Sequence, residues 1–175
     1  METEKNLEYT HVLHTFGPVY NANSKILILG SLPSVKSRKQ QFYYGHPQNR
    51  FWKVIATIFE ENIPETIEEK RTLLLKNQVA LWDVIESCDI IGSSDSSIRN
   101  VKENDMRVIL GQAKIEAILL NGSKAYELFI KYCQAYTKNE NLKLVKLPST
   151  SPANATWTLD RLTQIWKNEI IACLK

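Results

Sequence analysis

Four short runs rich in Val, Ile and Leu recur along the chain, and three of them are followed directly by Gly, Asn or Pro. The runs cover residues 26–29, 79–82, 115–120 and 142–147. Short apolar runs that do not alternate strictly are typical of strands buried on both faces of a parallel sheet. The pattern therefore predicts four buried strands.

Apolar residues at three- and four-residue spacing occur between and after these strands and predict helices. The helices are expected over 50–62, 64–77, 104–111, 125–136 and 159–173, with loops over 92–97 and 148–157. Pro64 suits a first helical turn, and Asn104 and Thr158 suit N-cap positions. Strands that alternate with helices pack as a parallel sheet covered on both faces. We therefore expect an α/β fold, a three-layer α/β/α sandwich around a four-stranded, mostly parallel sheet.

The composition is that of a folded globular protein. The chain has 175 residues, of which 43% are hydrophobic and 23% charged, and both fractions are ordinary for globular domains. This length fits a single domain over residues 1–175. The formal net charge of +3 permits a nucleic-acid partner without requiring one, because an ordinary soluble surface explains it equally well.

Cysteine usage and hydropathy exclude several classes of protein. The three cysteines form an odd number without Cys-x-x-Cys spacing, which argues against a disulfide framework and structural zinc. We expect no metal and no cofactor. The charged N-terminus has no apolar signal core, and no run approaches the ~18 apolar residues of a membrane helix. A soluble, cytoplasmic monomer that does not bind membranes is expected.

Polar segments follow three of the predicted strands directly. They cover residues 30–34, 121–123 and 148–154. In parallel α/β sheets, ligands bind beyond the carboxyl ends of the strands. We therefore expect the three segments to share one edge of the sheet and to form a single site.

Four segments in this order resemble the motifs of the uracil-DNA glycosylase superfamily. They read GSLPS at 30–34, HPQNRFWK at 46–53, LLNGSKAYE at 119–127 and LPSTSPAN at 147–154. The block YYGHPQN at 43–49, together with SPAN, resembles the hypoxanthine-DNA glycosylase branch, also called DNA-deoxyinosine glycosylases. The resemblance implies an enzyme that flips a deaminated base out of DNA and hydrolyses its N-glycosidic bond. No lysine in these motifs is placed for a Schiff base, so a monofunctional enzyme is expected.

The resemblance places the catalytic amide at Asn49. Cleavage of an N-glycosidic bond builds positive charge on the sugar, and an amide that accepts a hydrogen bond from water can hold that water against the sugar carbon. Its place before a helical run also suits Asn49 as an N-cap. The two roles are compatible.

The same resemblance implies a pocket for the extruded base. Tyr44 matches the aromatic residue that stacks on the base, with Phe42 and Tyr43 as competing candidates or core residues. Asn121 can read the edge of hypoxanthine with its carbonyl and amino group, or it can stabilise the turn before Gly122. Two residues of the first motif are also expected to contact the base, namely Ser31 and Leu32.

Two further segments are candidate DNA contacts. The basic run Lys36, Arg38 and Lys39 can meet phosphates, and a solvated charge run is the alternative. The final motif offers hydrogen-bond donors and an apolar pair that could press into the minor groove. Its candidate residues are Ser149, Ser151, Pro152, Ala153 and Asn154.

Three positions depart from the wider superfamily. Leu32 stands where most uracil glycosylases have a water-activating Asp or Asn, and Asp83 stands near the usual base-reading Asn. Ala153 stands where relatives insert a large apolar wedge. The departures at Leu32 and Asp83 favour excision of hypoxanthine over uracil, and the departure at Ala153 leaves the means of extruding the base open. The alternatives are a mismatch-specific uracil or thymine glycosylase, and a DNA-binding relative with weak or no catalysis.

Overall fold

A fully parallel sheet forms the centre of the computed structural model, which describes residues 8–138 and 141–175. Its strands lie in the order β3-β2-β6-β7, and each neighbouring pair is parallel. The strands are β2 (Ile26–Gly30), β3 (Val79–Asp83), β6 (Ala117–Asn121) and β7 (Lys143–Leu147). Every residue of β2 and β3 is buried, as expected for strands covered on both faces. The predicted four-stranded sheet is confirmed.

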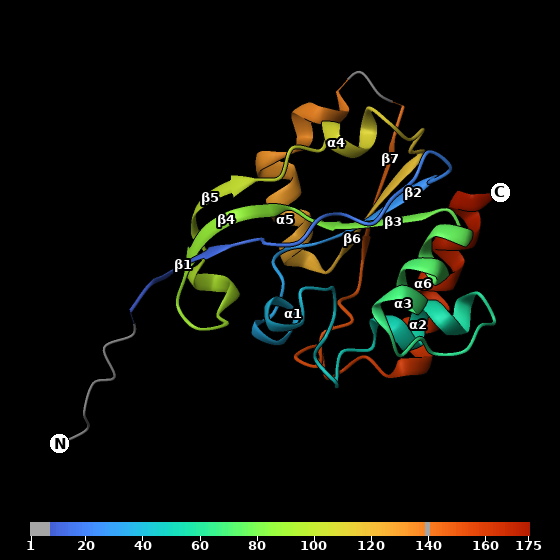
Figure 1. Ribbon diagram of the computed structural model, residues 1–175, viewed down its shortest axis with the longest axis horizontal. Helices are drawn as coiled ribbons and strands as arrows, with labels where there is room; N and C mark the ends of the chain where they lie inside the picture. The colour runs from blue at the N-terminus through green and yellow to red at the C-terminus, as the bar shows by residue number, and fades with distance from the viewer. Residues whose placement is uncertain (1–7, 139–140) are drawn as a thin grey trace.

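Helices cover both faces of this sheet and make the predicted three-layer sandwich (Figure 1). On one side lie α2 (Phe51–Ile58), α3 (Ile67–Lys76) and α6 (Leu159–Leu174). On the other lie α4 (Arg107–Leu110) and α5 (Ser123–Tyr132). No helix in the described part of the chain is long and apolar enough to span a membrane.

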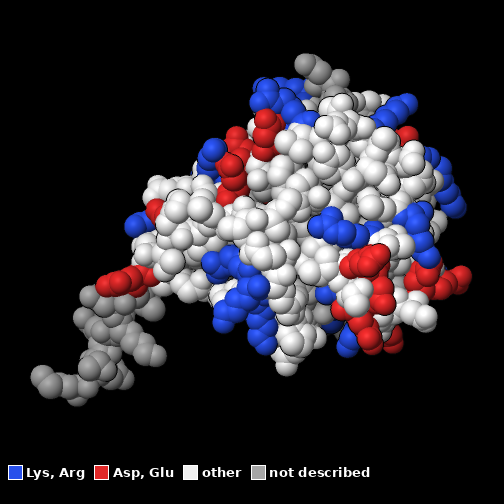
Figure 2. All heavy atoms as spheres, in the orientation of Figure 1, with Lys and Arg blue, Asp and Glu red and all other residues white. Residues whose placement is uncertain are grey.

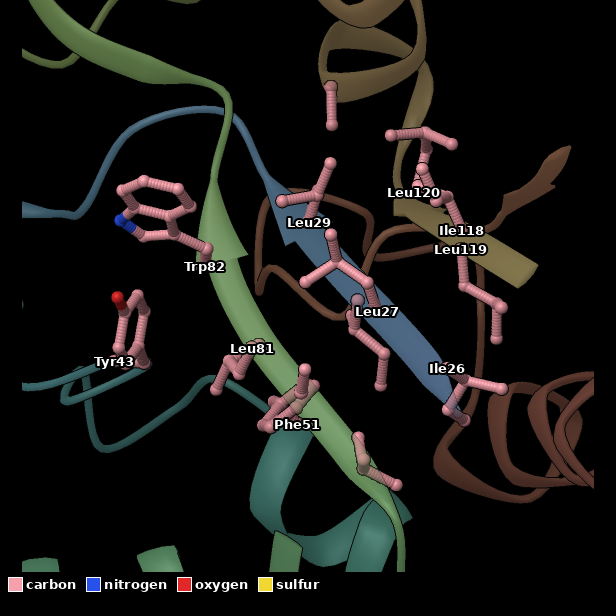
Figure 3. Packing of buried hydrophobic residues seen from close by; sticks show 14 of the residues in the cluster. Ile26, Leu27, Leu29, Tyr43, Phe51, Leu81, Trp82, Ile118, Leu119 and Leu120 are labelled. Carbon is pink, nitrogen blue, oxygen red and sulfur yellow. The ribbon is translucent and has the colours of Figure 1, made fainter. Parts of the chain in front are cut away.

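The layer of α2 and α6 is joined to the sheet by large aromatic side chains. Phe51 and Trp166 are both 0% exposed, and their ring centroids lie 6.0 Å apart in an edge-to-face arrangement. Figure 3 shows Phe51 beside Leu81 of β3. Because Phe51 is the first residue of α2, this packing fixes where the helix begins relative to the ends of the strands.

A second sheet, which we call the ribbon, was not predicted. It is antiparallel, with the order β1-β4-β5, and continues from β3 after Val84 (Figure 1). Its strands are β1 (Thr10–Leu13), β4 (Ile85–Ile90) and β5 (Arg99–Glu103). Only one residue of β1 and none of β5 is buried, and the β4–β5 register shifts twice. Such strands carry no apolar run for a sequence pattern to reveal.

Several predicted helix boundaries were wrong for identifiable reasons. The second helix begins at Ile67 rather than Pro64, because Thr66 and Glu69 form a capping box there. Asn104 does not cap a helix. Its amide donates to the carbonyl oxygens of Asp83 and Ile85, at 2.9 and 3.2 Å, and so ties the end of β5 to the β3–β4 junction.

A short helix, α1 (Val35–Gln40), was also missed. Ser34 caps it by accepting a hydrogen bond from the Ser37 backbone N–H. The fourth predicted helix is shorter than expected, since α5 ends at Tyr132 and a 3₁₀ turn, Gln134–Thr137, follows. The basic run at 36–39 therefore lies on a helix.

Candidate active site

A cleft of about 970 Å³ opens at the carboxyl ends of the parallel strands, within the size range of small-molecule sites. The residues that end β2, β3, β6 and β7 all line it: Gly30, Asp83, Asn121 and Leu147. All three predicted polar segments contribute to it, so their convergence on one edge is confirmed. Of the candidate site residues named from the sequence, all line the cleft except Lys36, Lys39 and the competing stacking candidate Phe42.

Asn49 lies half-buried at the wall of the cleft, one residue before the formal cap of α2. Its side-chain Oδ1 accepts hydrogen bonds from the Phe51 N–H and from the Thr150 hydroxyl, both at 2.9 Å. The first bond satisfies an unpaired N–H at the start of the helix, as a cap does. Asn49 therefore supports the helix start and also faces the cleft.

A short polar chain connects Asn49 to the base-binding candidates. Asn121 Nδ2 donates to the hydroxyl oxygens of Tyr44 and Thr150, each at 3.1 Å, and Asn121 Oδ1 accepts from the Thr150 N–H at 3.1 Å. Both amide hydrogens of Asn121 are therefore engaged within the protein. One lone pair of Oδ1 is left for a ligand, so the side chain does more than stabilise its own turn.

Tyr44 lies half-buried in the cleft, whereas Phe42 lies in the core and Tyr43 reaches the cleft wall from a core position. Phe42 and Tyr43 are each 2% exposed. The Tyr44 ring stacks on Phe51, with centroids 4.1 Å apart and planes 22° apart. Burial, reinforced by the nearby charge of Asp83, raises the pKa of Tyr44 far above its usual range, so its hydroxyl stays protonated.

The first motif brings the backbone close to these side chains. A Cβ added at Gly30 would lie 2.5 Å from Asp83 Oδ1 and 2.9 Å from the Tyr44 hydroxyl. Only glycine allows this approach. Ser31 and Leu32 follow directly and line the cleft, each half-buried.

Asp83 is held by a histidine from outside the motifs. His14, just after β1, places Nε2 2.8 Å from Asp83 Oδ2, and the two side chains are 1% and 4% exposed. A carboxylate only accepts, so the hydrogen lies on Nε2. His14 also packs against Phe16, with ring centroids 4.5 Å apart. The floor of the cleft therefore contains a buried, paired carboxylate.

Arg50 fastens the final motif to the start of α2. Its backbone N–H donates to the Thr150 carbonyl at 3.1 Å, and its guanidinium donates to the Ser151 and Asn154 carbonyls at 2.8 and 3.1 Å. It also donates to the carbonyl of Trp157. A planar guanidinium suits several fixed acceptors at once. Asn49 and Arg50 together hold the loop over 150–157 against the cleft.

The final motif also stabilises itself. Ser149 and Ser151 hydroxyls accept from the N–H groups two residues ahead, at 3.1 and 3.2 Å, and Asn154 Nδ2 donates to the Ser149 carbonyl at 3.0 Å. Pro152 and Ala153 are exposed at the tip. These hydrogen bonds support the loop from within, and its small apolar tip is exposed.

The basic residues lie on α1 at the rim. Lys36 and Lys39 are exposed, three residues apart on one helix face, while Arg38 is half-buried and lines the cleft. Arg38 Nε is buried and has no hydrogen-bond partner in the described residues. Figure 2 shows Lys and Arg side chains gathered over this part of the surface, whereas acidic side chains gather over the region of α3.

Sequence reasoning missed three residues that shape this site: His14, Arg50 and Thr150. Arg50 lies inside a quoted motif, yet its four carbonyl partners lie a hundred residues away. Thr150 also lies in a motif, but only its burial and its hydrogen bonds to Asn121 and Asn49 reveal its role. His14 lies before the first strand of the parallel sheet, and nothing in the local pattern pairs it with Asp83. In the described ranges, 8–138 and 141–175, no three His, Cys, Asp or Glu residues gather as metal ligands would.

Comparisons with known proteins bear on this cleft. A family model described as the uracil DNA glycosylase superfamily matches residues 18–172. A Methanosarcina acetivorans protein named hypoxanthine DNA glycosylase is 37% identical over 150 residues, 83% of this chain and 90% of that protein. A Methanosarcina barkeri protein of the same name is 36% identical over 114 residues, 64% of this chain and 72% of that protein. A solution NMR structure from M. acetivorans, described as a candidate uracil DNA glycosylase, superposes with a TM-score of 0.77 at 33% identity, covering 91% of this chain and 97% of that one.

Proposed function

Because the chain belongs to the uracil DNA glycosylase superfamily, as its four motifs predicted, we propose that it excises hypoxanthine from DNA. Hypoxanthine arises in DNA when adenine is deaminated. The enzyme releases the free base by hydrolysis of the N-glycosidic bond and leaves an abasic site. Two relatives that carry the name hypoxanthine DNA glycosylase support this choice.

One observation carries the proposal. Asn49 and Tyr44 come from one motif and Asn121 from another, and the three form one hydrogen-bonded unit. Asn121 donates to Tyr44 directly and is linked to Asn49 through Thr150. A core has no need for a connected set of polar and aromatic groups in an open cleft. An enzyme that stacks a flipped base and acts on its sugar bond needs such a set.

The parts of the cleft have distinct roles in this proposal. The flipped base enters beside Ser31 and Leu32, and Tyr44 stacks on it, a contact worth ~1–3 kcal/mol. The protonated Tyr44 hydroxyl and the Asp83 carboxylate offer a donor and an acceptor on the cleft floor. The final motif holds the extruded nucleotide, and Lys36, Arg38 and Lys39 contact phosphates at the rim. The protein acts as a monomer.

Asp83 suits a base that carries a ring N–H. Hypoxanthine has a hydrogen on N1, which a carboxylate accepts, whereas adenine presents a lone pair there. Bound adenine would therefore leave the Asp83 oxygen that is not paired with His14 buried and without a donor. Leaving a buried polar group unpaired discriminates strongly between ligands. Uracil also carries a ring N–H, so this contact alone does not reject uracil.

The test is a panel of fluorescent duplexes that carry hypoxanthine, xanthine, uracil or thymine at one position. Under single-turnover conditions with excess enzyme, we expect hypoxanthine to be released fastest. Equal or faster release of uracil would replace the proposal with the mismatch uracil-glycosylase alternative. Retention of DNA without any alkali-labile product would indicate a binding protein.

The same duplexes test the monofunctional mechanism. Among the described residues, Lys124 and Lys146 are the lysines that line the cleft, and Lys124 lies within one of the four motifs, so it is the one we test. A Schiff base between lysine and the opened sugar is trapped covalently by borohydride. We expect no trapped complex. A trapped complex that disappears in Lys124→Gln would instead establish a lyase.

A further inference from the structure

Two backbone N–H groups fix the direction of every hydrogen bond around Asn49. The Phe51 N–H can only donate, so the atom 2.9 Å from it is the carbonyl oxygen of Asn49. The Thr150 N–H likewise identifies Oδ1 of Asn121 as its acceptor at 3.1 Å. Neither amide can be turned round without leaving a backbone donor unpaired, so both orientations are determined.

Thr150 completes this chain. Since Asn121 Oδ1 faces the backbone, Asn121 Nδ2 donates to the Thr150 hydroxyl oxygen at 3.1 Å. The hydroxyl has a single hydrogen, which it donates to Asn49 Oδ1 at 2.9 Å. Asn49 Oδ1 therefore has both lone pairs engaged, one by Phe51 and one by Thr150. The Thr150 residue is 0% exposed, so water does not compete for these bonds.

Asn49 consequently presents its amino group to the cleft. Within the described residues, Asn49 Nδ2 has no hydrogen-bond partner, whereas Oδ1 has two. This differs from the expectation that the amide accepts a hydrogen bond from the attacking water. An amide nitrogen donates and does not accept, so it stabilises negative charge.

Negative charge develops on the leaving base during the reaction. The bond between C1′ and N9 breaks, and its electron pair passes to the purine ring. Water then adds its oxygen to C1′, and the proton that this water loses ends on the released hypoxanthine. A donor placed against the ring is stabilising only as that charge appears, which lowers the barrier.

We propose that Asn49 Nδ2 donates a hydrogen bond to a ring nitrogen of the leaving purine, and that Thr150 is the positioning residue that holds the amide this way round. The inference rests on the proposed function and assigns the chemistry of its central side chain. Asn49 is then a catalytic residue that acts on the base. Its effect on water is secondary.

Asn49→Asp separates the two possible roles. The new carboxylate keeps an acceptor for both Phe51 and Thr150, so the helix start and the fold are retained, but it offers no donor. We expect the single-turnover rate on hypoxanthine DNA to fall at least ~100-fold, with an unchanged melting temperature. A rate equal to or above that of the unaltered enzyme would mean that Asn49 orients water, and would overturn the proposal.

Thr150→Val tests the positioning role, with Thr150→Ser as its matched control. Valine keeps the shape and removes the hydroxyl, so we expect the excision rate to fall about 10-fold. Affinity for DNA that carries an uncleavable 2′-fluoro deoxyinosine should not change. Serine keeps the hydroxyl and should restore the rate. Rates are corrected for the folded fraction, and equal rates for Thr150→Val and Thr150→Ser would reduce Thr150 to a structural residue.

Deoxyinosine analogues that lack ring N3 or N7 identify the acceptor. If Asn49 Nδ2 donates to one of these atoms, the defect of Asn49→Ala shrinks to a few-fold on that analogue, as in a double-mutant cycle. An undiminished defect on both analogues overturns the contact with the base. Failure of the unaltered enzyme to release hypoxanthine would instead refute the proposed function, before any variant is compared.

Discussion

The parallel sheet and the ribbon meet at the β3–β4 junction but contribute differently to the cleft. The parallel sheet buries whole strands and carries the motif loops at its carboxyl edge. The ribbon buries little of β1 and β5. It supplies His14 and the tip of the β4–β5 hairpin, where Gly92, Ser93 and Asp95 line the cleft. One sheet therefore presents the reacting groups, and the other supports and encloses them.

Two histidine–aspartate contacts illustrate the difference between the exposed ribbon and the buried floor of the cleft. Both histidines lie on or beside β1, three residues apart. His11 and Asp89 meet at 2.7 Å with side chains 60% and 24% exposed, while His14 and Asp83 meet at 2.8 Å with side chains 1% and 4% exposed. The two distances are nearly equal, although His11 uses Nδ1 and His14 uses Nε2, and the exposure to solvent differs greatly. A buried partner left alone is costly, whereas an exposed one is satisfied by water.

The largest expected effect is on stability. His14→Phe keeps an aromatic ring against Phe16 but leaves the Asp83 carboxylate buried and unpaired. We expect the free energy of unfolding to fall by about 3 kcal/mol, the lower end for a broken buried pair, because Asp83 borders the cleft. Urea denaturation measures the change.

His11→Phe, on β1 itself, is the matched control. Its partner Asp89 keeps a hydrogen bond from Asn100 at 2.8 Å and has access to water, so we expect little loss. Hydrogen bonds from Asn100 and His11 lower the pKa of Asp89, which keeps it charged at neutral pH in either case. Equal destabilisation by the two variants would contradict the argument that burial separates the pairs.

The sequence predicted the parallel sheet because its strands are buried on both faces and read as apolar runs. It could not predict the ribbon, whose short strands alternate irregularly and pair through the bulged β4. The candidate site divides in the same way. Asn49, Tyr44 and Asn121 could be named from their motifs. Thr150, which bonds to both Asn49 and Asn121, emerges only when residues a hundred positions apart are brought together. Local hydrophobic patterns in a sequence indicate which residues are buried, but they do not indicate which distant residues pair with one another.

The second effect is on catalysis. Here we expect a large loss of excision rate with only a small loss of stability. Asn49→Ala removes both the donor in the cleft and the acceptor for the Phe51 N–H. We expect excision to fall at least ~100-fold, with a loss of only ~1 kcal/mol of stability, as for a missing cap. His14→Phe should do the opposite and lower stability more than the rate per folded molecule. Normal excision by Asn49→Ala, after correction for folding, would leave Asn49 as a cap alone.

A smaller effect is expected where the parallel sheet holds the final motif. Arg50→Lys keeps the charge but cannot reach the carbonyls of Ser151, Asn154 and Trp157 together. We expect faster amide hydrogen exchange over residues 151–157 and an excision rate lowered about 10-fold, as for a misplaced catalytic loop. Exchange in the ribbon should not change. Faster exchange throughout the chain would mean that Arg50 supports the whole fold rather than this loop.

The smallest effect concerns charge at the rim. Lys36 and Lys39 project from α1 beside the cleft, whereas Lys102 projects from β5 of the ribbon, where it pairs with Glu86 at 2.8 Å. If only the edge of the parallel sheet meets DNA, each lysine lost from α1 should reduce the slope of log affinity against log salt by ~0.9, and weaken binding to damaged and undamaged duplexes alike. Lys36→Gln and Lys39→Gln should therefore reduce the slope additively, while Lys102→Gln should leave it unchanged. Fluorescence anisotropy across a salt series measures the slopes. A reduced slope for Lys102→Gln would mean that the ribbon also contacts DNA. The two sheets would then differ in what they contribute to the cleft but not in their contact with DNA at the surface.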